Sequence, residues 1–247
     1  TVYGTSRRAE PELRERLTDA GFYLIQMDVD YDESVARGVQ MILEREGRID
    51  VAVNSAGFGI AGAVEDTSIE EAKAQFETNF FGILRVCKQV LPIMRERRAG
   101  YIVNISSMGG RIGLPYVALY HASKFAVEGL TESLRMEVKP FGIRVVLIEP
   151  GDFRTDFTAR RVCTAESQRN LVYAKPFRNV LQTIASDEQG GSSPEMVARI
   201  LARIIENPSP RLRYMVGSTF QKVAVVLKGI LPWWLFEWAF MKRYGAM

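Results

Sequence analysis

The amino-acid sequence predicts one α/β domain built on a doubly wound parallel sheet. Segments with the apolar pattern of strands alternate with segments of helical periodicity along most of the 247 residues. The clearest strand candidate, 143–148, is a run of branched apolar residues without polar alternation, which is typical of a strand covered on both faces. Because no repeat, low-complexity stretch or linker interrupts the pattern, we expect a single domain over residues 1–247.

The boundaries of the expected elements follow from proline and glycine. Pro11 lies where a helix would begin and Gly21 where it would end. Pro92 lies inside the longest helix candidate, 69–97, where a proline can bend a helix. Between about 151 and 191 the periodicity is loose, and it does not separate a lid from ordinary helix packing there. We expect strands at 1–5, 22–27, 49–53, 101–105, 143–148 and 213–216, and helices at 11–21, 33–46, 69–97, 118–139 and 193–206.

Composition argues against several classes of protein. The formal net charge is +3, from 32 basic and 29 acidic residues, and no long basic block is present, so we expect no nucleic-acid partner. The two cysteines lie in unrelated contexts and there is one histidine, which argues against a disulfide framework and a metal site. The early charges at Arg7, Arg8 and Glu10 argue against a signal peptide, and no uncharged apolar run is long enough to span a membrane. We therefore expect a cytoplasmic protein.

Tyr120 and Lys124 are the first candidates for chemistry. Their spacing of four residues puts both side chains on one face of the predicted helix. A nearby ammonium group favours the phenolate and lowers the pKa of a tyrosine, which would bring proton transfer closer to neutral pH. A surface tyrosine beside a solvated lysine has the same spacing, so the pair alone does not establish a site.

Two other polar residues lie at informative positions. Ser107 follows the strand expected at 101–105, at the edge where α/β sheets bind ligands, so its hydroxyl can bond a substrate oxygen. The other interpretation is a turn serine that bonds its own backbone, which we expect of Ser106. Asn79 lies on the apolar stripe of the long helix, where a buried amide needs partners. It could hold a water or a backbone segment in the active site, or be a polar core residue that distorts the helix.

Five motifs carry a family resemblance. They are Asn-Ser-Ala-Gly at 54–57, Asn-Phe-Phe-Gly at 79–82, Ile-Ser-Ser at 105–107, Tyr-His-Ala-Ser-Lys at 120–124 and Pro-Gly at 150–151. In this order and at these spacings they resemble the short-chain dehydrogenase/reductase family, over residues 1 to about 216. The resemblance implies a Rossmann-type sheet that binds NAD or NADP. It also implies an enzyme that moves a hydride between the nicotinamide and a secondary alcohol or ketone.

The resemblance assigns roles to the catalytic candidates. Tyr120 would be the acid/base and Ser107 would orient the reacting oxygen. Lys124 would hold the nicotinamide ribose and lower the pKa of the tyrosine, and Asn79 would hold a water in a proton relay behind it. His121 is one residue from Tyr120 and should point about 100° away around the helix, so we expect no substrate contact from it.

The resemblance also implies a set of cofactor-binding residues. Asp28 would meet the adenine amino group with Val29 beside it, whereas Pro150, Gly151 and Thr155 would flank the nicotinamide. Asn54, Ala56 and Gly57 would line the adenosine ribose, and Tyr120 and Lys124 would also touch the cofactor.

The end of the first strand indicates which cofactor is used. An acidic residue at the end of the second family strand selects NAD, and a nearby arginine accommodates the 2′-phosphate of NADP. No acid ends the strand at 1–5, whereas Ser6 and Arg7 follow it and could bind a phosphate. We therefore expect NADP rather than NAD, although an ordinary basic loop would give the same pattern.

The family's first strand, its Gly-rich turn and the following helix would precede Thr1. That strand would lie between those expected at 1–5 and 49–53, so its neighbours' edges would be unpaired. We expect the whole protein to have these parts, because the turn holds the cofactor pyrophosphate. A chain that truly began at Thr1 would put cofactor binding in doubt.

The last third of the chain bears on substrate and partners. Residues 152–192 would form the substrate lid, and 149–155 is similar to members that act on steroids, retinoids or acyl lipids, so we expect a bulky apolar small molecule. The tail, 220–247, is rich in apolar residues and holds Trp233, Trp234 and Trp238. It is either an amphipathic helix on a membrane surface or a helix that covers the substrate mouth or meets a subunit partner.

Three functions remain open at this point. The leading hypothesis is an active NADP-dependent alcohol dehydrogenase or ketoreductase, which we expect to be a homo-oligomer as is common in the family. The second is a non-catalytic binding or regulatory protein that keeps the fold. The third, an epimerase or dehydratase, usually carries a larger C-terminal substrate domain than the segment that follows Gly151.

Overall fold

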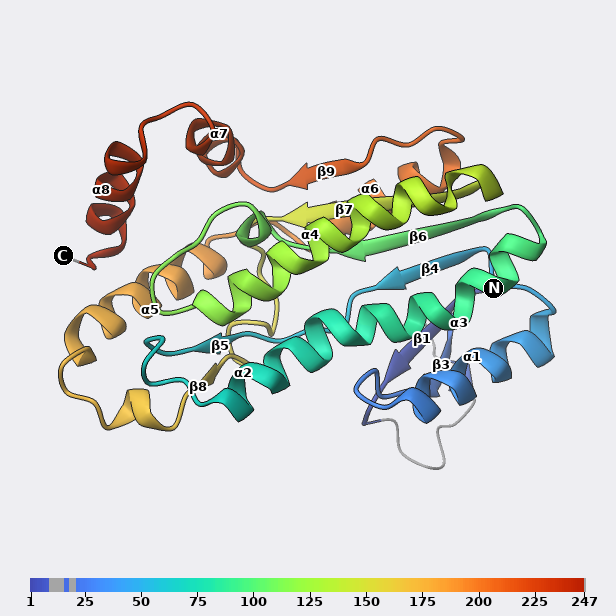
Figure 1. Cartoon of the computed structure of the whole chain (residues 1–247), viewed down its shortest axis with the longest axis horizontal. Coiled ribbons are helices and arrows are strands. Elements are labelled where there is room, and N and C mark those ends of the chain that lie inside the picture. Colours follow the sequence, from blue (N-terminus) through green and yellow to red (C-terminus); the bar gives the residue numbers. More distant parts are fainter. Residues whose placement is uncertain (9–15, 18–20, 247) are drawn as a thin grey trace.

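The computed structural model describes residues 1–8, 16–17 and 21–246, with side chains from the first and last of these ranges. A four-stranded parallel sheet forms its centre (Figure 1). The strand order is β4-β6-β7-β9, with β4 at Val51–Asn54, β6 at Gly100–Ile105, β7 at Ile143–Pro150 and β9 at Arg213–Val216. This sheet confirms the predicted α/β class and its parallel strands.

Helices cover both faces of this sheet, as the apolar strand at 143–148 predicted. Ile143, Val145 and Leu147 of β7 pack against one group of helices: α1 at Asp32–Glu46, α3 at Gly82–Glu96 and α4 at Ala118–Val138. The alternate residues Val146 and Ile148 pack on the opposite face with α6, Glu195–Glu206. Because consecutive strand residues point to opposite faces, a strand with two buried faces is mostly apolar on both, and in β7 the polar exceptions are Arg144 and Glu149 near its ends.

A second, smaller sheet has the order β1-β3-β2, with β1 at Tyr3–Ser6, β3 at Tyr23–Gln26 and β2 at Arg16–Leu17. β1 and β3 are parallel, and β2 is antiparallel to β3. The predicted helix at 11–21 is therefore wrong at 16–17, because ladder pairing with β3 overrides local preference there. The rest of that prediction, 11–15 and 18–20, lies outside the described residues. Within the described chain, β1 and β4 each pair along one edge only.

The helix predicted at 69–97 has three parts. Helix α2, Ile69–Phe76, begins at a capping box formed by Ser68 and Glu71. A π-helical turn follows at Glu77–Phe81, and α3 continues from Gly82 through Pro92 to Glu96. The sequence missed the π turn because one inserted residue barely disturbs the apolar period. Such turns are frequent at functional sites, and this one contains Asn79.

The segment from the end of β7 through α5 lies at one end of the molecule, near the C-terminus (Figure 1). It contains β8 at Val162–Cys163, which pairs with β5 at Ile60–Ala61, and then α5 at Ala174–Gln189. The segment whose pattern is loose, 151–191, thus contains a helix, because packing of Val180 and Ile184 stabilises a helix of weak intrinsic pattern. Short 3-10 turns occur at Met108–Gly110, Lys139–Phe141 and Glu166–Gln168.

The apolar tail forms two helices rather than one. Helix α7 spans Thr219–Lys228 and α8 spans Trp233–Tyr244. Pro232 is the N-cap of α8, since it cannot continue the preceding helix. Among the described helices, none combines the length and apolarity that crossing a bilayer requires.

Candidate active site

A cavity of about 560 Å³ opens at the carboxyl ends of β4, β6 and β7. In an open parallel sheet these strand ends meet at one edge, which is where ligands bind. The inner wall of the cavity is formed by the ends of these strands and by α4, and carries Ser107, Tyr120 and Lys124. The outer wall is formed by residues after Pro150, which cover that edge from α5, α7 and α8.

Ser107 lies where β6 ends in extended backbone and a 3-10 turn begins. Its Oγ accepts a hydrogen bond from the Gly109 N–H at 2.9 Å and donates to the Pro150 carbonyl at 3.4 Å. Ser107 thus caps a turn and lines the cavity at the same time. The expectation that Ser106 bonds its own backbone is wrong, because its buried Oγ has no hydrogen-bond partner among the described residues.

Tyr120 and Lys124 lie on the cavity face of α4. The Lys124 Nζ lies 5.9 Å from the centroid of the Tyr120 ring and donates to the Ile105 carbonyl at 2.9 Å. Burial lowers the pKa of Lys124 to about 8, and Glu128 opposes this shift. Burial raises the pKa of Tyr120, and the Ser107 hydroxyl lowers it. The net shift of the Tyr120 pKa is upward, opposite to the lowering that the sequence led us to expect.

Asn79 is completely buried, and its amide group hydrogen-bonds the backbone of Phe58. Its Oδ1 accepts from the Phe58 N–H at 3.0 Å, and its Nδ2 donates to the Phe58 carbonyl at 3.0 Å and to Ser123 Oγ at 3.1 Å. Of the open interpretations, the one in which Asn79 holds a backbone segment matches these contacts. A Cβ at Gly57 would lie 3.1 Å from Asn79 Oδ1 and 3.9 Å from Lys124 Nζ, so a glycine keeps this approach open.

Gln75, one helical turn before Asn79, also hydrogen-bonds the backbone of this segment, and the sequence did not single it out. Its Oε1 accepts from the Ile60 N–H at 2.7 Å, and its Nε2 donates to the Phe58 carbonyl at 2.8 Å. Gln75 is completely buried, like Asn79. The available signal was a second amide four residues before Asn79 on the same apolar stripe. Together the two amides fix the segment at 58–60, which forms part of the cavity wall.

The structure brings only some of the expected cofactor residues to this cavity. Gly57, Pro150, Gly151 and Thr155 line it together with the catalytic candidates. The side chain of Asn54 does not, because its buried amide donates to Asn104 Oδ1 at 2.8 Å inside the sheet.

The other cofactor candidates lie away from the cavity lining. Ser6 and Arg7 come at the end of β1, where Ser6 Oγ accepts from the Arg8 N–H at 3.2 Å. Asp28 accepts the Asp30 N–H at 3.1 Å, and the Val29 carbonyl accepts from Arg85 at 3.2 Å. These four residues follow β1 and β3, and Ala56 is exposed in the loop after β4.

His121 lines the cavity, although its offset from Tyr120 around the helix indicated that it points away. Val117, Tyr120, His121 and Lys124 all face the cavity, which is a helical stripe at spacings of three and four. An offset of 100° from Tyr120 therefore still leaves His121 on the wide face that the cavity touches. Its Nδ1 lies 2.7 Å from the Gly109 carbonyl, and burial lowers its pKa.

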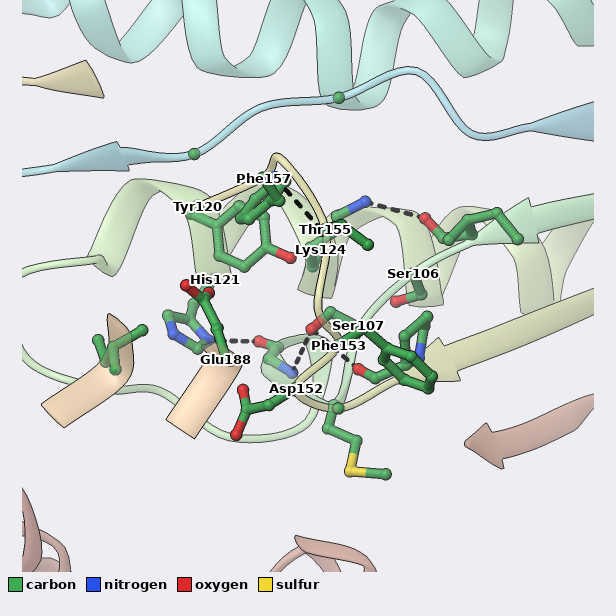
Figure 2. Close-up of a pocket in the computed structure, with 18 of the residues that line it drawn as sticks. Ser106, Ser107, Tyr120, His121, Lys124, Asp152, Phe153, Thr155, Phe157 and Glu188 are labelled. Atoms are coloured by element: carbon green, nitrogen blue, oxygen red, sulfur yellow. Dashed lines mark hydrogen bonds between the residues drawn. The ribbon is translucent and has the colours of Figure 1, made fainter. Parts of the chain in front are cut away.

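The outer wall includes Phe157 of the expected lid segment, together with Asp152 and Glu188, which the sequence did not single out (Figure 2). The Phe157 ring lies 5.5 Å from the Tyr120 ring, centroid to centroid. Glu188 of α5 accepts from Arg161 at 2.6 Å in a nearly buried ion pair. Asp152 accepts from Gln221, and burial together with the nearby Asp187 and Glu188 raises its pKa to about 6. The spacing of these residues in the sequence does not predict that they lie close together, because the folded path of the chain after β7 brings them to one wall.

A dinucleotide-type sheet with a serine, a tyrosine and a lysine at its carboxyl edge defines a class of oxidoreductases. The family model described as short chain dehydrogenase matches residues 2–165, and the chain belongs to this family. The protein is accordingly an NAD(P)-dependent oxidoreductase that acts on CH–OH groups, and it has the Rossmann-type fold.

Curated and solved relatives agree with this assignment. The chain is 41% identical over 231 residues to a 3-ketodihydrosphingosine reductase of Bacteroides thetaiotaomicron, covering 94% of this chain and 84% of the relative. It is 38% identical over 213 residues to retinol dehydrogenase 8 of Bos taurus, covering 84% and 67%. A solved short-chain dehydrogenase from Streptomyces avermitilis superposes with a TM-score of 0.78 at 34% identity, covering 93% and 84%.

Proposed function

We propose that the protein transfers a hydride between NADP(H) and a bulky, largely apolar secondary alcohol or ketone. The observation that carries the proposal is the convergence of Ser107, Tyr120 and Lys124 on one wall of an otherwise largely apolar cavity. When bound, the nicotinamide ring supplies or accepts the hydride. Every other part of the chemistry falls to side chains of this chain.

The proton transfer follows from the positions of the inner-wall groups. In the direction of reduction, Ser107 and Tyr120 hydrogen-bond the carbonyl oxygen, and Tyr120 donates its proton to that oxygen as the carbonyl carbon gains the hydride. In oxidation, the phenolate takes the proton back. Asn79 acts at a distance: it fixes Phe58, and with it the segment at 58–60 that forms part of the cavity wall.

The residues around Lys124 fit a nicotinamide nucleoside. An ammonium group has three N–H donors, and Lys124 uses one on the Ile105 carbonyl, which leaves two for ribose hydroxyls. A pKa of about 8 keeps most of the ammonium protonated at neutral pH. Pro150, Gly151 and Thr155 would flank the ring, whereas Asp28, Val29, Asn54, Ala56 and Gly57 would contribute to the adenosine side.

Two features support NADP over NAD and an apolar substrate. No carboxylate ends β1, and the exposed Arg7 follows it, free to pair with a 2′-phosphate. The cavity walls are mostly aliphatic and aromatic, and two relatives are named for 3-ketodihydrosphingosine and retinol, both mainly hydrocarbon compounds.

The test is a fluorescence titration with NADPH and NADH, followed by turnover of NADPH with aliphatic ketones of increasing chain length. We expect tighter binding of NADPH and a kcat/KM that rises with chain length. Arg7→Asp should reduce the NADPH preference by about tenfold, because it removes a charge-assisted pair, while Arg211→Asp, an exposed change elsewhere, should not. Binding without turnover of any alcohol or ketone would favour a non-catalytic role, and equal affinities would refute the NADP assignment.

A further inference from the structure

Helices α7 and α8 expose an unusually apolar surface. We call the tail surface the set Phe220, Val223, Val226, Ile230, Trp233, Trp234 and Trp238, whose exposed fractions range from 47% at Val223 to 71% at Ile230. The three tryptophans are all those of the chain. Large aromatic side chains grouped on a protein surface mark a site of interaction rather than an ordinary surface.

The opposite sides of the same helices are packed. Phe236 is buried, and its ring stacks on Phe240 with centroids 4.2 Å apart, followed by Tyr244 at 6.0 Å from Phe240. Val225 of α7 is buried against the same cluster. The tail helices are therefore held on the domain by one face while the other face has no partner among the described residues.

The tail surface is continuous with the mouth of the cavity. Phe220 belongs to both, because it is 68% exposed and also lines the cavity. Gln221, Ala224, Phe240 and Tyr244 line the cavity from the inner sides of α7 and α8. Figure 1 shows the two helices at the end of the molecule where the chain finishes. Any partner on the tail surface thus sits next to the entrance for substrate.

The charges near the tail surface are basic. After Gly217 the sequence contains Lys222, Lys228, Lys242 and Arg243 but one acid, Glu237, which gives this segment a formal charge of +3. Arg243 is paired with Asp187, so the three lysines supply the basic charge beside the tail surface. The Lys242 ammonium lies 5.2 Å from the Trp238 ring centroid, at the rim of the surface. Tryptophan and lysine side by side are typical of the membrane–water interface, where amphipathic rings and long cationic side chains reach both phases.

We propose that the tail surface docks on an anionic lipid bilayer and presents the cavity mouth to the membrane. A bilayer fits better than a second copy of the chain: a protein seated beside Phe220 would obstruct the entrance, whereas lipid would deliver an apolar substrate into it. Basic residues add attraction to anionic headgroups, and the exposed rings insert at the headgroup boundary. The route of the substrate rests on the proposed function, but docking itself does not.

The tryptophans allow a direct test, because the intrinsic tryptophan fluorescence of the chain comes from the tail surface alone. The whole chain is titrated with phosphatidylcholine vesicles and with vesicles containing one third phosphatidylserine. We expect a blue shift and co-sedimentation with the anionic vesicles, both weakened by salt. The paired substitution Ile230→Gln and Trp234→Gln should weaken partitioning by at least about tenfold, since it removes two exposed apolar groups from insertion.

Matched controls separate docking from other causes. Leu171→Gln with Val172→Gln changes two exposed apolar residues, 85% and 79% exposed, far from the tail in sequence, and should leave partitioning unchanged. Turnover of a water-soluble ketone without vesicles should be the same in both paired variants. No blue shift with anionic vesicles, or equal partitioning of the two variants, would overturn the proposal. The proposal would also be overturned if the protein were a dimer and the tail variant dissociated that dimer without changing vesicle binding. If the unaltered protein docked on the vesicles but turned over no alcohol or ketone, the proposed function would be contradicted while the docking proposal would stand.

Discussion

The two walls of the cavity are built on different principles. On the inner wall, polar groups are fixed by buried partners: Lys124 on the Ile105 carbonyl, Asn79 and Gln75 on the backbone at 58–60. The outer wall combines aromatic and aliphatic side chains, several of them exposed, with the charged residues Asp152, Arg161 and Glu188, all from loops and helices after Gly151. The difference indicates that one wall sets the chemistry and the other sets what enters. Substitutions on the two walls should therefore have separable effects.

The largest effect is expected at Tyr120 on the inner wall. Tyr120→Phe removes the proposed proton donor without changing the ring that packs on Phe157, so kcat should fall by about a thousandfold while NADPH affinity stays within about twofold. Steady-state turnover and cofactor titration measure the two quantities. Tyr101→Phe is the matched control, because the Tyr101 hydroxyl bonds the Asn207 carbonyl away from the site. Substantial turnover by Tyr120→Phe would show that another group transfers the proton.

The next largest effect is expected at Asn79, where stability and activity should fall together. Asn79→Leu leaves the Phe58 N–H without its acceptor and Ser123 without its donor, at a cost of about 2–4 kcal/mol in the free energy of unfolding. Because the segment at 58–60 would shift, kcat should fall as well. Urea unfolding and turnover measure the two effects.

Gln182→Leu, an exposed change on α5, is the control for substituting an amide on a helix. Full activity in a destabilised Asn79→Leu protein would show that the position of Phe58 does not matter for catalysis. A loss of activity alone, with unchanged unfolding, would favour a direct role such as holding a water.

The sequence predicted the inner wall far better than the outer one. The spacing of Tyr120 and Lys124 placed both on one helix face, and Ser107 followed from the rule that strand ends meet at one edge. These inferences depend on local periodicity, which a single sequence displays. The buried strand β7 was predictable for the same reason.

Features that depend on contacts distant in sequence were missed. The pairing of β2 with β3 overrode a predicted helix, and the π turn that aims Asn79 left no trace in the apolar period. The ion pair of Arg161 and Glu188 joins positions 27 residues apart on the outer wall. Helix α5 depends on packing against the residues around Val117, which no local pattern encodes.

The smallest predicted effect lies on the outer wall, at Asp152, and tests whether that wall carries electrostatic strain. Its pKa is raised to about 6, first by burial and then by Asp187 and Glu188. A carboxyl group with a raised folded pKa stabilises the fold below its unfolded pKa, about 3.9, and loses this contribution as the pH rises through about 6. Asp152→Asn should therefore raise the free energy of unfolding by about 1–2 kcal/mol at pH near 8, and the gain should vanish at pH near 4.

Urea unfolding across this range measures the difference, with the exposed Asp156→Asn as the control on the same loop. A gain that is the same at every pH would trace the effect to packing around Gln221 rather than to charge, and the contrast between the two walls would then fail at this residue.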